Sequence, residues 1–266
     1  MPSAAFEPRV ALASLSGAAD AEWARAGADH AGAAFLGGIA LDGPTRAAAR
    51  DLVARDREEF LPSDPVAFVE TQLDALADAP VRPGVNVRAA SPDPIAEVAA
   101  ACAARDASVE TSAHCGEPAM CGAGCGEALL RAADRLRAFV AAAADAGATT
   151  SVKVRAEVSG VDLPAVARAA AGAGADAIHV DAMDAEPVVG AVADAAPSLF
   201  VIANNGVRGA RSVREYLDHG ADAVSIGRPS SDPAVRRRVR RAVEAWDRGA
   251  RTSADTPRPD AEVDAP

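Results

Sequence analysis

A single lysine is the most unusual chemical group in this sequence. Of the 27 basic residues, all but Lys153 are arginines. Lys153 falls in the short apolar segment Thr150–Val154, which is typical of a buried strand. An ammonium is a compact point charge that a guanidinium cannot replace in a confined site. A solvated surface lysine is the ordinary alternative, but arginine fills the basic positions elsewhere. We therefore expect Lys153 to be functional.

A glycine-rich segment directly follows the expected strand Ser108–Thr111 and holds three cysteines, Cys115, Cys121 and Cys125. Together with His114 these cysteines could form a zinc site, although the spacing lacks the paired C-x₂-C of structural zinc. A second interpretation is a reactive thiol that donates a proton at neutral pH. A third is that small cysteines simply pack a tight loop.

Polar residues also follow the last three expected strands. Asn205-Gly206 and Gly227-Arg228 come after the seventh and eighth strands, where barrels commonly bind phosphate. Glycine lets backbone N–H groups approach an anion, and arginine adds a bidentate charge; two ordinary turns are the alternative. His179 ends the sixth strand and is either a core histidine or part of the same site as Lys153.

Eight short apolar segments alternate with helical patterns, and each is bounded by Gly, Pro or Asp. They predict strands at Val10–Ser14, Ala33–Leu36, Gly84–Arg88, Ser108–Thr111, Thr150–Val154, Ala177–Val180, Leu199–Ala203 and Ala223–Ile226. This order favours a single-domain (β/α)₈ TIM barrel over residues 1–250, followed by a disordered, acidic and Pro-rich tail at 251–266. A doubly wound open sheet is the competitor, but no Gly-x-Gly-x-x-Gly follows the first strand.

Helix boundaries are marked by two recurring signals. Glycines in the repeated Ala-Gly-Ala theme are expected to end helices, at Gly27, Gly147, Gly174 and Gly220. Asp-Pro pairs are expected to begin them, with the aspartate as N-cap, at Asp64, Asp93 and Asp232.

Composition limits the classes of protein that fit. The net charge of -11 and the shortage of lysine are typical of a salt-adapted protein and argue against a broad basic face for nucleic acid. The sequence contains no apolar run of about 18 residues, so we expect no membrane span, and the N-terminus does not resemble a secretory signal. We expect a cytoplasmic protein without a disulfide framework.

The motifs, taken in order, resemble those of the FMN-dependent tRNA-dihydrouridine synthases, especially their shorter archaeal relatives. The resemblance covers roughly residues 10 to 230. The matching segments are Leu12-Ala13-Ser14-Leu15-Ser16-Gly17-Ala18-Ala19-Asp20, Val85-Asn86-Val87-Arg88, Ser112-Ala113-His114-Cys115-Gly116, Gly124-Cys125-Gly126-Glu127-Ala128-Leu129-Leu130, Val152-Lys153-Val154-Arg155, His179, Asn205-Gly206-Val207 and Ile226-Gly227-Arg228.

The resemblance implies a flavoenzyme in which FMN lies across the mouth of the barrel. It implies that Ser14 binds the cofactor and that the flavin ring or ribityl chain contacts Asn86, Lys153 and His179. It also implies that the phosphate is held by Asn205, Gly206, Gly227 and Arg228. Cys115 would deliver a proton to C5 of a pyrimidine while hydride passes at C6. The implied substrate is a pyrimidine, possibly within tRNA, and the implied electron donor is NAD(P)H.

Three positions depart from the family's pattern. Ser112, Gly116 and Asp181 stand where the family has asparagine, proline and arginine, and no tRNA-gripping helical domain follows Arg228. Two other functions stay open on the residues alone. One is a flavin-free, phosphate-binding lyase or isomerase that uses Lys153 as a Schiff-base amine. The other is a non-catalytic barrel.

Overall fold

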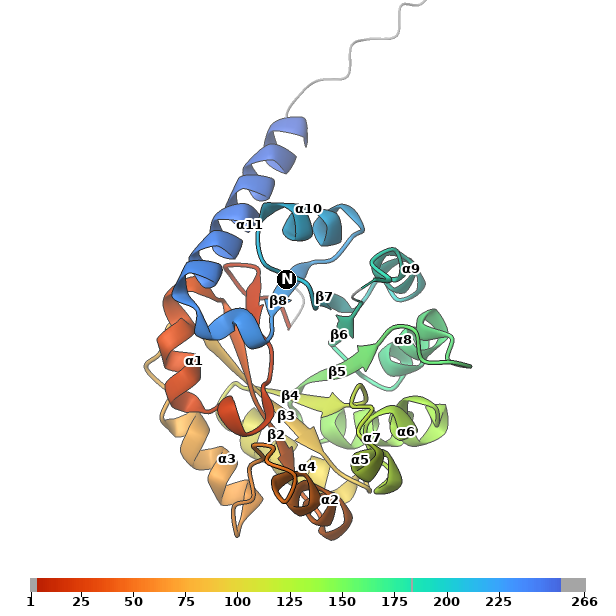
Figure 1. Ribbon diagram of the computed structural model, residues 1–266. Coiled ribbons are helices and arrows are strands. Elements are labelled where there is room, and N and C mark those ends of the chain that lie inside the picture. The colour runs from red at the N-terminus through yellow and green to blue at the C-terminus, as the bar shows by residue number, and fades with distance from the viewer. Residues whose placement is uncertain (1–3, 183, 255–266) are drawn as a thin grey trace, which may run out of the picture.

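Eight parallel strands close into a barrel with helices around the outside (Figure 1). The computed structural model describes residues 4–182 and 184–254, with the backbone alone described for 250–254. Each strand pairs with its sequence neighbours, and β8 pairs with β1 through Val10–Val224, Ala11–Ser225 and Leu12–Ile226. The predicted (β/α)₈ barrel is therefore confirmed.

All eight expected strands are present, and they differ from the prediction mainly at their ends. They are β1 (Val10–Leu12), β2 (Ala33–Ala40), β3 (Arg82–Arg88), β4 (Ser108–Ser112), β5 (Thr149–Arg155), β6 (Ala177–Asp181), β7 (Phe200–Asn204) and β8 (Ala223–Ile226). The largest difference is in β2, which runs four residues past the predicted end at Leu36. Gly37-Gly38 interrupts the apolar pattern there, yet the backbone keeps pairing with β3 through an irregularity between Gly37 and Ile39.

The helices form the outer layer. They are α1 (Ala21–Gly27), α2 (Gly43–Val53), α3 (Pro65–Asp74), α4 (Asp93–Ala103), α5 (Pro118–Gly122), α6 (Glu127–Leu130), α7 (Ala133–Asp145), α8 (Leu163–Gly172), α9 (Val188–Ala195), α10 (Ala210–Asp218) and α11 (Pro233–Ala254). Short 3₁₀ turns lie at η1 (Ser16–Ala18), η2 (Ala28–His30) and η3 (Arg228–Ser231). The connections after β2 and β4 carry more than one helix.

Helices end at or just before all four of the predicted glycines, and three of these glycines have a positive φ. Gly147, Gly174 and Gly220 have φ of 85°, 100° and 95°, the left-handed backbone that glycine tolerates after a helix. Gly27 is the last residue of α1, as predicted, but its φ of -102° shows that it does not adopt the left-handed backbone. A Cβ at that position would come within 2.4 Å of Leu12 Cδ1, so close packing explains this glycine instead.

Two of the three aspartate caps are confirmed. Asp64 accepts hydrogen bonds from the N–H groups of Val66 and Ala67, and Asp232 accepts one from Ala234 N–H. The prediction is wrong for Asp93, which is the first residue of α4 and follows Pro92 at the N-cap. Its carboxylate still lies in the first turn, where the helix dipole favours negative charge.

The barrel interior changes character along its axis. At the N-terminal end, Phe6, Phe35 and Phe200 form an apolar plug together with small side chains. Above the plug, the inward-facing residues are polar and buried, and Glu110 and His179 are both 0 % exposed. The C-terminal end is open and holds the cavity described below. An interior that turns polar toward that end matches the face at which barrels place their sites.

The C-terminal helix is longer than the sequence indicated. α11 continues through Ala254 and so includes four residues of the expected tail at 251–266. Residues 255–266 lie outside the described residues. Within the described chain, no helix combines the length and the apolar character that a membrane span needs.

Candidate functional site

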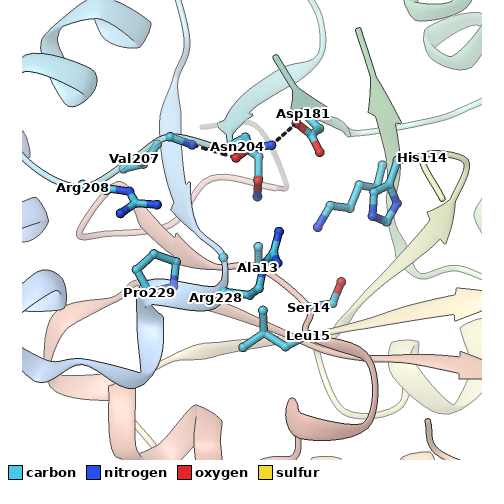
Figure 2. Close-up of a pocket in the computed structure, with 14 residues that line it drawn as sticks. Ala13, Ser14, Leu15, His114, Asp181, Asn204, Val207, Arg208, Arg228 and Pro229 are labelled. Atoms are coloured by element: carbon cyan, nitrogen blue, oxygen red, sulfur yellow. Dashed lines mark hydrogen bonds between the residues drawn. The ribbon is translucent and has the colours of Figure 1, made fainter. Parts of the chain in front are cut away.

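A cavity of about 490 Å³ opens at the C-terminal ends of the strands (Figure 2). It is lined by Ala13, Ser14, Leu15, His114, Lys153, Asp181, Asn204, Asn205, Gly206, Val207, Arg208, Gly227, Arg228 and Pro229. Its volume falls within the usual range of small-molecule sites. Six expected cofactor-binding residues lie in this lining: Ser14, Lys153, Asn205, Gly206, Gly227 and Arg228. Asn86, His179 and Cys115, also expected in the site, are not among the lining residues.

Positive side chains line this cavity without protein counter-ions in contact. Lys153 is 3 % exposed, and its ammonium makes no hydrogen bond or ion pair with any described residue. The guanidinium groups of Arg208 and Arg228 likewise have no hydrogen-bonding or ion-pairing partner within residues 4–182 and 184–254. The cavity wall carries one carboxylate, Asp181, which accepts a hydrogen bond of 2.8 Å from Asn205 Nδ2. The surplus of unpaired positive charge indicates an anionic ligand.

The turn after β7 is held in a strained but well-supported conformation. Asn205 and Gly206 both have left-handed backbones, with φ of 81° and 64°. The hydroxyl of Tyr216, on α10, lies 3.1 Å from the carbonyl oxygen of Asn204 and 3.0 Å from that of Asn205, so it can donate to either. A Cβ added at Gly206 or at Gly227 would meet no atom within 4 Å, so open space adjoins both backbones.

A fully buried hydrogen-bond network lies directly beneath the cavity. Glu110 accepts from Asn86 Nδ2 at 2.7 Å, from Ser151 Oγ at 3.3 Å and from His179 Nδ1 at 2.8 Å. On its other side, His179 Nε2 lies 2.7 Å from Ser225 Oγ, and Asn204 Nδ2 donates to that same oxygen at 2.7 Å. The network therefore joins β3, β4, β5, β6, β7 and β8.

The network fixes the protonation of its members. Burial is the largest influence on the pKa values of His179 and Glu110. It lowers the pKa of His179, and on its own it would raise the pKa of Glu110. The nearby His179, Lys153 and Asn86 outweigh burial and hold the pKa of Glu110 below its usual value. A neutral His179 thus donates from Nδ1 to an ionised carboxylate and accepts at Nε2. Because both ring nitrogens are satisfied within the protein, His179 supports the cavity floor.

His114 is a cavity residue that the sequence interpretation of the flavin site left out. Its Nδ1 lies 3.2 Å from Ser112 Oγ, and it lines the cavity together with Lys153. Figure 2 shows His114 across the cavity from Arg208. Burial, then Lys153 and Arg88, lower the pKa of His114 well below its ordinary value. Its position just after β4 was the available signal, since barrel strands end at the site.

Cys115 lies in the loop after β4 and is not among the residues that line the cavity. It packs against a small cluster that includes Ala40, Met120 and Cys125. Burial raises the pKa of the Cys115 thiol, so the thiol keeps its proton at neutral pH. Cys121 donates from Sγ to the carbonyl oxygen of Cys115 at 3.4 Å. Within the part of the chain that the structure describes, no group of three or more His, Cys, Asp or Glu side chains could hold a metal ion.

A buried ion pair anchors the loop that precedes α3 to the barrel. Arg88 Nη1 lies 2.6 Å from Glu59 Oε2, and the two side chains are 6 % and 2 % exposed. Arg88 Nη2 also donates to Ser16 Oγ at 2.8 Å. No sequence motif links Glu59 to Arg88, and only the fold brings them together.

The buried histidines predict that stability falls in mild acid. A histidine with a lowered folded-state pKa is harder to protonate folded than unfolded, so the free energy of unfolding decreases as pH falls below about 6.5. Glu110, whose pKa is also lowered, acts in the same direction at still lower pH. Urea unfolding at pH 7.5 and pH 5 measures the decrease, and His179→Gln should make it shallower. Equal slopes in the two proteins would contradict this role of His179.

Comparison with known proteins gives likeness in structure alone. No family model matches the sequence, and no curated protein sequence matches it. DHODH from Eimeria tenella superposes with a TM-score of 0.69 at 16 % identity, covering 93 % of this chain and 83 % of that one. FabK from Thermotoga maritima superposes with a TM-score of 0.52 at 17 % identity, covering 85 % of this chain and 63 % of the FabK chain. A chain of the tryptophan synthase complex from Pyrococcus furiosus superposes with a TM-score of 0.56 at 13 % identity, covering 90 % of this chain and 98 % of that one. At these identities the likeness shows the shared barrel fold.

Proposed function

We propose that this protein is an FMN-dependent oxidoreductase that acts on the C5=C6 bond of a pyrimidine, in tRNA or as a small molecule. The observation that carries the proposal is the set of three unpaired cations, Lys153, Arg208 and Arg228, around one cavity at the strand ends. DHODH and FabK, which share the fold, are FMN-dependent oxidoreductases, and this supports the flavin assignment.

The residues present suit a ligand with a phosphate at one end and an electron-poor ring at the other. Arg228 and the open backbones of Gly206 and Gly227 would hold the phosphate, with Asn205 shaping the turn. Lys153 and Ser14 would contact the ring or ribityl chain. When bound, FMN supplies hydride transfer, and a positive charge beside its ring stabilises the reduced form. Asn86 and His179 would act from below, through Glu110.

Proton delivery is assigned to the loop after β4. We propose that Cys115 donates the proton to C5 of the pyrimidine, because burial raises its pKa and keeps the thiol protonated. NAD(P)H is the proposed electron donor. A second function, a flavin-free lyase that forms a Schiff base at Lys153, is favoured by one observation: burial lowers the pKa of Lys153 and so makes the free amine more accessible.

An absorbance spectrum of the purified protein separates the two functions. A flavin spectrum, or tight binding of added FMN followed by fluorescence quenching, is expected for the oxidoreductase. A colourless protein that binds no FMN, but is trapped at Lys153 by borohydride with a carbonyl compound, would establish the lyase class instead.

The role of Cys115 is tested by substitution in the FMN-bound protein. Cys115→Ala is expected to keep FMN binding and reduction by NADPH, yet to lose formation of dihydrouridine in unmodified tRNA or uridine. Cys121→Ala, a second half-buried cysteine of the same loop, is the matched control and should retain product formation. Full product formation by Cys115→Ala would remove the proton-donor role.

A further inference from the structure

In the function proposed above, the buried carboxylate of Glu110 serves only as the group through which Asn86 and His179 act. Glu110 lies at the centre of the barrel, is 0 % exposed, and accepts three hydrogen bonds from three other strands. A carboxylate is costly to bury, and it is tolerated only where charges or hydrogen bonds compensate. Its hydrogen-bond donors, Asn86, Ser151 and His179, are an amide, a hydroxyl and a neutral imidazole. These donors form hydrogen bonds to both carboxylate oxygens of Glu110, but none of them carries a positive charge that would balance the carboxylate.

The unpaired positive charge of the barrel interior is the Lys153 ammonium, and it lies one layer of side chains above Glu110. On β5, Ser151 and Lys153 are alternate residues and face the same way, and on β4 so do Glu110 and Ser112. Pairing of the strands sets Glu110 beside Ser151 and Ser112 beside Lys153. Lys153 also pairs in register with His179, the residue that donates to Glu110. The ammonium and the carboxylate therefore occupy neighbouring layers, without a direct ion pair.

We propose that Glu110 is a positioning residue: it is the internal counter-charge that keeps the Lys153 ammonium protonated while leaving all its donors free for an anionic ligand. A carboxylate in direct contact would occupy those donors and repel the ligand. Held one layer lower by three hydrogen bonds, Glu110 supplies the charge without entering the cavity. This proposal rests on the proposed function in one respect, because the anionic ligand would be the flavin. The effect of Glu110 on the protonation of Lys153 does not depend on which ligand binds.

Other charged groups face Lys153 and set the scale of the effect. Burial is the largest influence and lowers its pKa; Glu110 and then Asp181, on β6, raise it, and Arg88, on β3, lowers it. Arg88 is already paired with Glu59. The nearby His114 is neutral, because its own pKa is lowered. Asp181 lines the open cavity, where water screens it, whereas Glu110 is fully enclosed. Glu110 is therefore the stronger of the two carboxylates.

The single lysine allows a direct measurement on the ligand-free protein. Reductive methylation with ¹³C-formaldehyde labels Lys153 and the N-terminal amine alone, and the two resonances titrate separately. In Glu110→Gln, which keeps the shape of the side chain, the pKa of Lys153 should fall below that of the wild type. Glu110→Asp, which keeps the charge, should restore most of the difference. Asp194→Asn, a carboxylate exposed on α9, should leave the titration unchanged.

Equal Lys153 titrations in wild type and Glu110→Gln would overturn the inference, and so would a larger fall in Asp181→Asn than in Glu110→Gln. Should Glu110→Gln not fold, the wild type labelled with ¹³C at glutamate carboxyls still decides the question. One buried carboxyl resonance must then shift in step with the Lys153 titration, and the absence of such a resonance overturns the inference.

Titration of FMN binding distinguishes this inference from the function itself. If the wild type binds FMN, the alkaline pH at which affinity declines should move to lower pH in Glu110→Gln. If the alkaline pH at which FMN affinity declines is the same in both proteins, the proposed role of Glu110 is wrong. If the wild type binds no FMN at all, the flavin function is wrong. In that case the methylated-lysine titration still tests Glu110 independently.

Discussion

Lys153→Ala is expected to remove the flavin colour of the purified protein. Lys153 is 3 % exposed and lines the cavity, and its ammonium has no partner among the described residues, so a bound anion would be its principal partner. A hydrogen bond to a charged group contributes about 1.5–3 kcal/mol, which corresponds to roughly a 10- to 150-fold weaker Kd for FMN. The substitution also leaves the charge of Glu110 without its counterpart. Fluorescence titration with FMN measures the loss.

Two further variants sharpen this result. Arg237→Ala removes a cation from the exposed surface of α11 and should leave the Kd unchanged. Lys153→Arg keeps the charge, but its planar guanidinium is larger than an ammonium in a nearly closed position, so it should restore binding only in part. Unchanged FMN affinity in Lys153→Ala, with the fold intact by circular dichroism, would rule out the proposed flavin site.

Gly126→Ala is expected to have the largest effect on stability among single glycine replacements in the loop after β4. Gly126 has φ of 61°, and an added Cβ would lie 2.2 Å from the carbonyl oxygen of Cys115. That oxygen also accepts a hydrogen bond of 2.9 Å from the N–H of Glu127, so it cannot move away freely. Strain at a positive φ costs about 1–3 kcal/mol, to which the steric clash adds.

The matched control is Gly122→Ala, at the end of α5. A Cβ there would meet nothing within 4 Å, and alanine favours helix over glycine by about 1 kcal/mol. Thermal unfolding should therefore show a lower Tm for Gly126→Ala and an unchanged or higher Tm for Gly122→Ala. Because Gly126 supports the backbone of Cys115, its variant should also lose product formation. A Tm equal to that of the wild type would show that the loop rearranges without cost.

The sequence was sufficient for the architecture because barrel strands are local, apolar and evenly repeated. The segment Ala223–Ile226 was predicted with its observed bounds, and β2 was predicted with its start but four residues short. The shortfall arose because Gly37-Gly38 breaks an apolar pattern without breaking strand pairing. Helix ends at Gly147, Gly174 and Gly220 followed from the conformational freedom of glycine, whereas Gly27 is set by contact with Leu12, a partner outside its own helix.

The candidate site was predictable where function follows from position at a strand end. Lys153, Gly206 and Arg228 line the cavity as expected, because parallel strands deliver their C-terminal residues to one rim. The direction and contacts of a side chain carry no such local signal. His179 was expected against a ligand, yet both its nitrogens are bound within the barrel.

By itself the sequence determined a closed β/α barrel and the rim that carries its unusual lysine, since both depend on local periodicity and on strand order. Only the tertiary structure decided that Glu110 is a buried carboxylate beneath Lys153, that His114 lines the cavity, and that Cys115 packs beside it. The physical reason is that burial and partners depend on the inward turn of each strand and on register between strands. Those quantities join residues far apart in the chain, such as Glu110 and His179, which are 69 positions apart.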